Sequence, residues 1–333
     1  MAKKRNAYIG IDIGGTKSLF ALFDEKFARI AEVKQMTHAA KGGRGAFRTM
    51  VRESVGELLQ VAKRHRKVVA AIGVGCAGIV EPGSGTIRVS PNAAFLRGFS
   101  FAETLAPLTD ARVCVLNDVQ AGLYGELELG AARKARHVIG IFIGTGIGGA
   151  LAIDGRIYTG AGGVAGDIGN YLLHAMGPLA GSLREGVLDD VASRTAIAGD
   201  AAVLAAKRWA PKLRAIAGTD VTAIKSTHLA RAIEGGDKAV EKLVRSRARV
   251  VGIALSNLVD FLNPQVLVLG GGLVEAMPSL IRNEVRKGIE AHATPVAFKD
   301  LKVRVAKLGD HAVTTGAAHL AADVISGRAP MPR

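Results

Sequence analysis

A single aspartate, Asp12, stands inside an apolar run that leads directly into two glycines, a threonine and a lysine (IGIDIGGTK, residues 9–17). Glycines that follow a strand let the backbone approach a ligand closely, and phosphate is the ligand most often bound there. A lone carboxylate beside phosphates suits one Mg²⁺ ion held through water. We therefore expect a phosphate-binding turn after this strand and a metal-related role for Asp12.

The same pattern returns later in the chain. Residues 9–24 (IGIDIGGTKSLFALFD) and 139–154 (IGIFIGTGIGGALAID) share six identical positions at a constant offset of 130 residues. Both are typical of strand, glycine turn, strand, whereas Walker A and dinucleotide motifs continue from the glycines into a helix. We interpret the repeat as a duplicated β-hairpin phosphate loop, as in actin-like ATPases; chance similarity of two apolar strands is the alternative. Phe142 replaces Asp12 in the second copy, so only the first carries a carboxylate.

A second carboxylate follows another apolar strand. Asn117 and Asp118 end the run VCVLND (residues 113–118) and precede a predicted helix. Because α/β folds bind ligands where strands end, Asp118 could take the proton of a hydroxyl group during phosphoryl transfer, and Asn117 could bind a polyol. Asp118 could equally be the N-cap of the helix, and position alone does not separate the two interpretations.

The rest of the chain alternates apolar strands with predicted helices. Helices are expected over about residues 47–64, 119–129, 186–208, 226–262, 278–292 and 313–325. This alternation is α/β patterning, and a chain of 333 residues suits two domains of roughly 150 residues each.

The composition is that of a globular protein, with 49% hydrophobic and 22% charged residues. Cys76 and Cys114 lie in apolar strands without CxxC spacing, which favours neither a disulfide nor a cysteine zinc site and fits the cytoplasm. We expect no signal peptide and no transmembrane segment. The formal net charge of +15 comes from basic residues on predicted helix faces without interleaved aromatics. We therefore expect no nucleic-acid or membrane partner, although the charge would attract ATP or polyphosphate.

Several motifs, in order, resemble the ROK family of sugar kinases: DIGGTK, SPN, ND followed by AGLYGE, GTGIGGALAIDGRIYTGAGGVAGDIGN, ASRTAIA and LNPQVLVLGGGL. The resemblance extends over nearly the whole chain. It implies a two-domain actin-like ATPase (ribonuclease H-like) fold and phosphorylation of a hexose or N-acetylhexosamine with ATP and Mg²⁺. It also implies a homodimer.

The resemblance further assigns roles to single residues. Asp118 is expected to be the general base, and Asp12 is expected to serve Mg²⁺. Sugar-binding positions are expected at Gly78, Asn92, Asn117, Asp167, Asn170 and Asp189. ATP-binding positions are expected at Gly14, Gly15, Thr16, Lys17, Gly144, Thr145, Gly146, Gly270, Gly271 and Gly272, the last three beside adenosine. Taken alone, the GGG run is more simply the start of a helix, and Asn92 is a simple turn residue.

The expected sugar pocket departs from the family pattern. GDIGN (residues 166–170) stands where the family has GEIGH, and GVLD (residues 186–189) stands where it has GCLE. Asp167 and Asp189 keep the charge and the acceptor oxygens of the glutamates on a side chain one methylene shorter. The three cysteines and the histidine that hold zinc in many ROK kinases are absent from these motifs, so we expect no zinc.

Two alternatives stay open. The altered pocket would also suit a sugar-binding regulatory protein without kinase activity, and a phosphate turn does not distinguish ATP from the polyphosphate that a polyphosphate-dependent glucokinase uses. For the domains, we expect a small one of residues 1–118, completed by the C-terminal helix 310–333, and a large one of residues 119–309.

Overall fold

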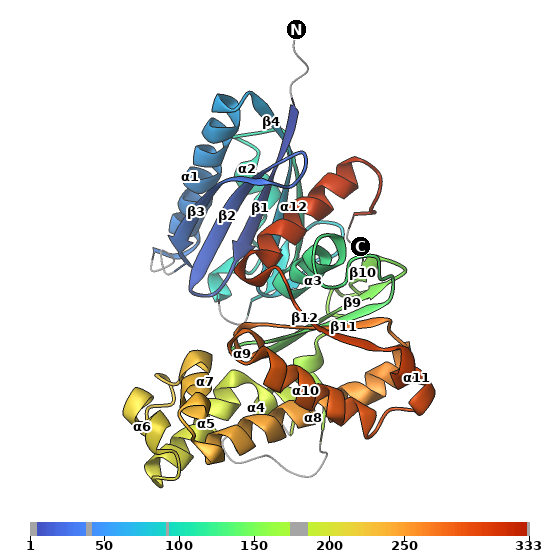
Figure 1. Ribbon diagram of the computed structural model, residues 1–333. Coiled ribbons are helices and arrows are strands. Elements are labelled where there is room, and N and C mark those ends of the chain that lie inside the picture. The colour runs from blue at the N-terminus through green and yellow to red at the C-terminus, as the bar shows by residue number, and fades with distance from the viewer. Residues whose placement is uncertain (1–4, 38–41, 91–92, 174–185, 332–333) are drawn as a thin grey trace. The chain divides into compact units, whose positions relative to one another are not determined.

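The chain folds into two compact units, each with a mixed sheet and helices (Figure 1). The computed structural model describes residues 5–37, 42–90, 93–173 and 186–331. Unit 1 comprises Met1–Lys134, Ala150–Ala165 and Asp310–Arg333, and unit 2 comprises Ala135–Gly149 and Gly166–Gly309. The predicted α/β class with two domains is confirmed. The boundary near residue 118 stays a prediction, because compactness alone does not define a domain that folds or moves by itself.

Unit 1 contains strands, helices and a short hairpin with these bounds: β1 (Arg5–Ile13), β2 (Lys17–Asp24), β3 (Arg29–Met36), α1 (Gly43–Arg64), β4 (Lys67–Cys76), β5 (Ile79–Val80), β6 (Ile87–Val89), α2 (Phe101–Leu105), β7 (Arg112–Asn117), α3 (Asp118–Glu128), β10 (Arg156–Tyr158) and α12 (Ala312–Ile325).

Unit 2 contains the remaining elements: β8 (Val138–Ile143), α4 (Leu188–Ala192), α5 (Arg194–Ala206), α6 (Pro211–Ala217), α7 (Ser226–Glu234), α8 (Lys238–Leu262), β11 (Val266–Gly270), α9 (Gly272–Ala276), α10 (Pro278–Glu290), α11 (Pro295–Asp300) and β12 (Lys302–Val305). Strand β9 (Ile147–Ile153) begins in unit 2 and continues into unit 1.

The two five-stranded sheets have the same strand order. It is β3-β2-β1-β4-β7 in the first sheet and β10-β9-β8-β11-β12 in the second. β1 pairs antiparallel with β2 and parallel with β4, and β8 pairs parallel with β11. The duplication predicted from residues 9–24 and 139–154 is therefore confirmed, and it extends beyond the hairpins to the whole strand order.

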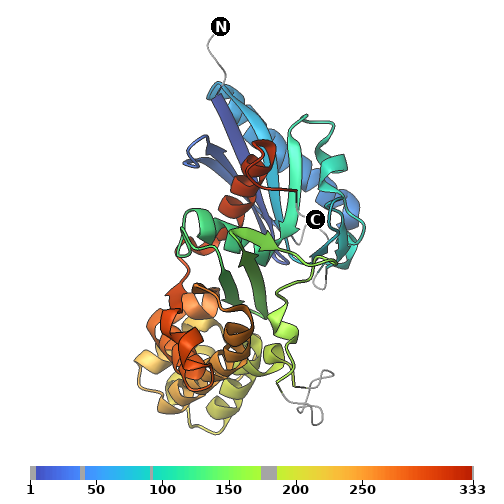
Figure 2. The same ribbon diagram turned by 90° about the vertical axis from the view of Figure 1, so that its right-hand side faces the viewer.

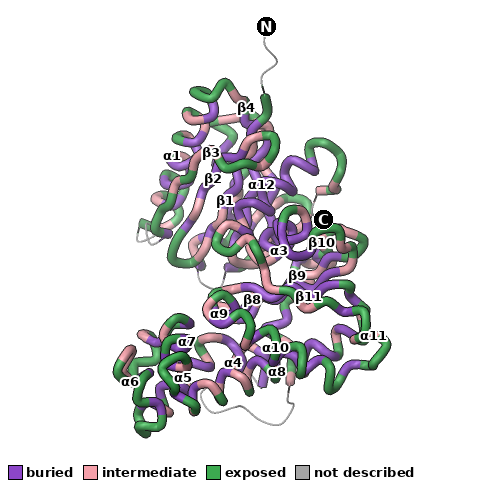
Figure 3. The backbone as a smooth tube through the Cα atoms, in the orientation of Figure 1, coloured by how far each residue is buried: buried purple, intermediate pink, exposed green. Residues whose placement is uncertain are grey.

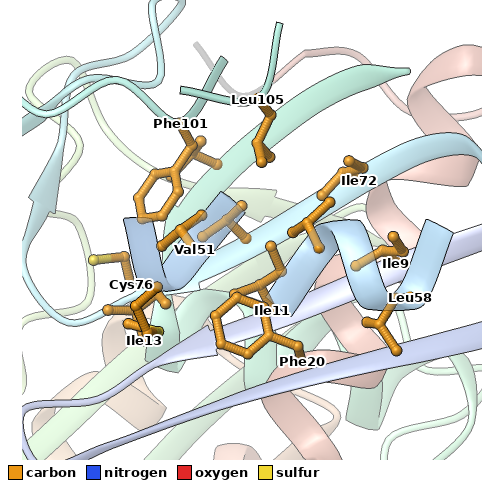
Figure 4. Close-up of a cluster of buried hydrophobic side chains, with 14 of the residues drawn as sticks. Ile9, Ile11, Ile13, Phe20, Val51, Leu58, Ile72, Cys76, Phe101 and Leu105 are labelled. Atoms are coloured by element: carbon orange, nitrogen blue, oxygen red, sulfur yellow. The ribbon is translucent and has the colours of Figure 1, made fainter. Parts of the chain in front are cut away.

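The core of unit 1 explains why the first strand is nearly all apolar. Ile9, Ile11 and Ile13 alternate along β1, so they share one face of the sheet, and they form a buried cluster with Val51 and Leu58 of α1 (Figure 4). Burying one such side chain stabilises the fold by about 1.5–3 kcal/mol. This packing fixes the carboxyl end of β1, where Asp12 lies.

Helix α12 covers the opposite face of the same sheet (Figure 2). It packs directly on backbone, because a Cβ on Gly73 of β4 would lie 1.8 Å from the carbonyl oxygen of Ala317. A Cβ on Gly316 would lie 1.9 Å from the carbonyl oxygen of Ala121 in α3. Figure 3 shows α12 buried along most of its length. The C-terminal helix thereby fixes α3, which carries Asp118.

Two of the predicted helices are each divided in two. The helix predicted over about residues 186–208 is α4 and α5, which Ser193 separates. The sequence predicts a single helix over about residues 226–262, but α7 ends at Glu234 and α8 begins at Lys238. Gly236 between them has a φ of 97°, a conformation that favours glycine and ends the helix. The carboxylate of Asp237 then accepts the backbone amide of Leu213 (2.7 Å), so the break anchors the start of α6.

Candidate active site

Three parallel strands of unit 1 end side by side. Ile13 of β1 pairs with Cys76 of β4, and Cys76 pairs with Asn117 of β7. Asp118 follows as the first residue of α3, and Asp12 lies one residue before the end of β1. The two candidate carboxylates are therefore at the same edge of one sheet, where α/β folds bind their ligands.

Asn117, rather than Asp118, is the N-cap of α3. Its Oδ1 accepts the backbone amides of Val119 (2.9 Å) and Gln120 (3.3 Å). Asp118 also accepts the Val119 amide, at 3.0 Å, but it occupies the first helical position. The structure therefore answers the question about the N-cap: Asn117 caps α3, and Asp118 follows it as the first helical residue.

Both carboxyl groups bind protons more tightly than ordinary aspartates. Burial raises the pKa of Asp118, and its hydrogen bond from Val119 offsets part of that shift. Burial also raises the pKa of Asp12 to about 7, and the negative charges of Asp118 and Asp310 add to it. Perturbed, mutually repelling carboxylates at a strand edge are typical of a functional site, where a cation or a proton relieves the repulsion.

Gly78 lies beside Asn117, whose Nδ2 donates to the Gly78 carbonyl oxygen (3.0 Å). Gly78 has a φ of 133°, and a Cβ there would lie 2.3 Å from the carbonyl oxygen of Val89. Only glycine fits this position, and the loop after β4 is held against residue 89. Asn92, the other candidate of this region, lies outside the described residues.

The first glycine turn joins β1 to β2 at the same edge. The amide of Gly14 donates to the carbonyl oxygen of Lys17 (3.1 Å) and closes the turn. Gly15, Thr16 and Lys17 are exposed. Within the described part of the chain, the amides of Gly15 and Thr16 have no hydrogen-bond acceptor, so both are available to a ligand.

The second glycine turn joins β8 to β9. The amide of Gly144 donates to the carbonyl oxygen of Gly146 (2.8 Å). The carbonyl oxygens of Gly144 and Thr145 accept the Arg194 amide (3.0 Å) and the Thr195 hydroxyl (2.7 Å) from the start of α5. Of the residues that the structure describes, none accepts the amides of Thr145 and Gly146.

The available amides occupy equivalent positions in the duplicated hairpins. At the offset of 130 residues, Gly15 corresponds to Thr145 and Thr16 corresponds to Gly146. Backbone N–H groups without internal acceptors in such turns bind the oxygens of phosphate groups. Each turn therefore presents the same pair of donors to a ligand.

The glycine run 270–272 lies next to the second turn. Gly271 has a φ of 87°, and a Cβ on it would lie 2.6 Å from the carbonyl oxygen of Ile143, the residue before Gly144. Gly270 ends β11 and Gly272 begins α9, so the interpretation of this run as a helix start is confirmed. The run that we expect beside adenosine thus contacts the end of β8.

The three candidates for sugar binding in unit 2 lie on two connected segments. Asn170 Nδ2 donates to Asp167 Oδ2 (2.6 Å), and both side chains are exposed. Asp189 Oδ1 accepts the amide of Ile147 (2.5 Å), and a Cβ on Gly146 would lie 2.8 Å from the same oxygen. Asp189 therefore supports the second turn, a contact that the sequence does not predict.

Arg194 and Thr195 also hold the second turn without having been singled out from the sequence. Arg194 Nη2 donates to Thr145 Oγ1 (3.1 Å). Their segment, ASRTAIA, does carry a signal, because Ser193 before a helical run predicts an N-cap, and its Oγ accepts the Ala196 amide. The sequence does not say which turn the helix start contacts. No sequence motif singles out Asp310, whose charge acts on Asp12.

The sequence matches the ROK family over residues 8–324. The chain belongs to the ROK family. A glucokinase from Halalkalibacterium halodurans is 28% identical to this ROK protein over 310 residues, which are 93% of each chain. An N-acetyl-D-glucosamine kinase from Photobacterium profundum is 29% identical, over 94% of this chain and 98% of its own.

Solved ROK structures have the same fold. A ROK glucokinase from Streptomyces griseus, solved in complex with glucose and AMPPNP, has a TM-score of 0.78 at 27% identity, covering 95% of this chain and 99% of its own. The ROK hexokinase from Thermus thermophilus has a TM-score of 0.76 at 29% identity, covering 96% and 99%. In the described part of this ROK chain, no helix has the length and apolar character needed to span a bilayer.

Proposed function

We propose that this ROK protein is a sugar kinase that transfers the terminal phosphoryl group of ATP to a hydroxyl group of a hexose or N-acetylhexosamine. The observation that carries the proposal is Asp118, a carboxylate with a raised pKa at the ends of β1, β4 and β7 that is not needed to cap its helix. The paired amide donors of both turns and the family membership support the same chemistry.

Asp118 acts as the general base in the proposed reaction. The sugar oxygen attacks the γ-phosphorus, the bond from that phosphorus to the β–γ bridging oxygen breaks, and the hydroxyl proton passes to the Asp118 carboxylate. The products are a sugar phosphate and ADP. Such transfers ask the protein mainly for positioning and charge neutralisation, and a raised pKa makes an ionised carboxylate a stronger proton acceptor.

The donor set of the sheet edge fits Mg²⁺, which prefers carboxylate and water oxygens. Asp12 would hold the ion through water, because the negative charges of Asp118 and Asp310 act on it and a cation would relieve their repulsion. When bound, Mg²⁺ neutralises charge on the phosphate chain.

The remaining residues bind the two substrates. We assign the phosphate chain to the amides of both turns and to Lys17, and the nucleoside to the run 270–272. We assign sugar binding to Asn117 and Gly78, which lie in the same unit as Asp118. The hydrogen bond between them shapes the loop that follows β4. The other positions that we assign to sugar binding are Asn92, Asp167, Asn170 and Asp189.

Polyphosphate is a second candidate donor. The turns recognise phosphate oxygens through backbone amides, which carry no preference for a nucleoside, and the formal net charge of +15 favours a long anion. ATP is the donor that we propose first, because the run 270–272 contacts the second turn and offers a place for adenosine.

A coupled assay of ADP release tests the proposal, run over a panel of hexoses and N-acetylhexosamines at fixed Mg·ATP, with Asp118→Asn as the control for contaminating kinases. We expect turnover with at least one sugar in the wild type only. Sugar-induced thermal stabilisation without any phosphorylated sugar would replace the proposal with the regulatory alternative. Phosphorylated sugar from polyphosphate but not from ATP would reassign the donor.

A further inference from the structure

Arg194 is a cation at the second glycine turn without a negative partner. It begins α5, and its guanidinium donates to Thr145 Oγ1 (3.1 Å) and to the carbonyl oxygen of Ile224 (3.2 Å). Both acceptors are neutral. Within the described ranges, no carboxylate forms a salt bridge with this guanidinium. A guanidinium has five N–H groups, so three donors remain.

Two arginines of α8 in unit 2 do have such partners. Arg247 pairs with Asp200 at 2.7 Å, and Arg249 pairs with Glu284 at 2.7 Å. Arg194 is half-buried like Arg247, and partial burial makes an unpaired charge costly. An anion bound at the second turn would supply the negative partner that Arg194 lacks among the described residues.

The surroundings of Arg194 say what kind of anion fits. On one side lies Thr145, next to the available amides of the second turn. On the other side lies Ile224, just before Ser226, whose Oγ would be 3.8 Å from a Cβ on Gly272. The guanidinium therefore contacts both the second turn and the segment that borders the run 270–272. Its planar fork of donors matches a phosphate group in charge and shape.

We propose, resting on the proposed function, that Arg194 binds the phosphate chain of the donor and sets the affinity of the second turn for it. The ligand class is a polyphosphorylated anion, such as a nucleoside triphosphate or inorganic triphosphate. Two donors hold the guanidinium against Thr145 and Ile224, and the others bind phosphate oxygens.

Calorimetry on the full chain tests this with AMPPNP, inorganic triphosphate and adenosine as probes. Arg194→Gln keeps a neutral donor but removes the charge, and Arg194→Lys restores the charge without the fork. Arg231→Gln is the control, because Arg231 is an exposed arginine of neighbouring α7 with no ion pair in the described residues. We expect Arg194→Gln to lower the affinity for AMPPNP and for triphosphate about tenfold and the affinity for adenosine less than twofold. Arg194→Lys should recover part of the lost affinity.

Three results would overturn the role of Arg194. If wild type and Arg194→Gln bind the phosphate probes with equal affinity, Arg194 does not bind the donor, while the proposed function still stands. An equal loss for adenosine, with a lower Tm, would show that Arg194 only holds the turn in shape. If the wild type binds none of the three probes, both the donor role of Arg194 and the proposed kinase function fall.

Discussion

The two glycine turns are copies of one hairpin, yet their side chains differ in charge. The first turn has a half-buried carboxylate in its strand, Asp12, with Asp118 and Asp310 nearby. The second has Phe142 in that place and the guanidinium of Arg194 beside Thr145. Both keep the same backbone donors. We propose that the duplicated backbone binds phosphate in both copies, that proton and metal chemistry take place beside the first copy, and that Arg194 adds a charged contact to the donor at the second.

The turns also differ in what holds them. The carbonyl oxygen of Thr16 in the first turn accepts the amide of Thr37, which follows β3. The second turn is held by α5 and by the carboxylate of Asp189 beneath it. A methyl group added at Gly146 therefore meets Asp189, and this makes it possible to disturb the second turn without changing Asp12 or Asp118.

The largest effect is expected from Asp118→Asn. Asparagine has the same shape and can still accept the Val119 amide, but it cannot take a proton from the sugar. We expect kcat to fall by about 10²–10⁴-fold while sugar affinity stays within about tenfold. Steady-state kinetics and sugar titrations measure both quantities. Asp110→Asn is the matched control, an exposed aspartate that precedes β7, and it should behave as wild type. A parallel loss of sugar binding and kcat would make Asp118 a structural residue.

The next largest effect is expected on the Mg²⁺ requirement of the Asp12→Asn variant. Removing the charge should raise the Mg²⁺ concentration needed for half-maximal activity by about tenfold or more, because Mg²⁺ prefers anionic oxygen donors. A Mg²⁺ titration of the initial rate at saturating ATP and sugar checks this. An unchanged Mg²⁺ requirement would separate Asp12 from the metal.

Gly146→Ala should damage the second turn. The new Cβ would lie 2.8 Å from Asp189 Oδ1, so the turn or the carboxylate must shift. We expect the KM for ATP to rise by about tenfold, since a displaced turn misaligns its donors. Gly144→Ala is the control, because its nearest neighbour, the Gly146 carbonyl oxygen, would be at 3.9 Å. Equal KM values in the two variants would contradict this account of the turn.

A smaller effect concerns stability and pH. The pKa of Asp12 rises from 3.8 to about 7 on folding, so folding is favoured by its neutral form. The stability that protonated Asp12 contributes is fully present below about pH 4, and it is lost as the pH rises through about 7. In the absence of Mg²⁺, Asp12→Asn should therefore melt roughly 2–4 °C above wild type at pH 8, with the gap closing toward pH 5. Melting curves over this range test the prediction, and a difference in Tm that does not depend on pH would contradict the raised pKa of Asp12.

The smallest expected effect is that of zinc removal. The chain has only two cysteines, both buried in strands of unit 1, so the segments around Asp167 and Asp189 have no thiolate ligand. We propose that they hold their shape without zinc. Metal analysis of the purified protein should find far less than one zinc per chain, and activity at excess Mg²⁺ should survive a zinc-selective chelator. Stoichiometric zinc would contradict this.

The sequence predicts the local features well, because they depend on neighbouring residues. The apolar strands that end in glycines, the carboxylate in one of them and the ND pair at a strand end are all readable from short stretches. β3 was missed because RIAEVKQM is a mostly exposed edge strand without an apolar face. Arg194 and Asp310 were missed for another reason. Arg194 matters through its hydrogen bond to Thr145 and Asp310 through the effect of its charge on Asp12, and nothing in the local pattern encodes either interaction.

The central claim is that proton transfer takes place at Asp118, beside the first hairpin, and that the second hairpin binds the donor. It is tested most directly by the dissociation constant of AMPPNP, measured by calorimetry for Asp118→Asn beside Gly146→Ala. We predict that Asp118→Asn binds AMPPNP within about threefold of wild type and that Gly146→Ala binds it at least tenfold more weakly. Equal weakening in both variants, or wild-type affinity in Gly146→Ala, would contradict the claim.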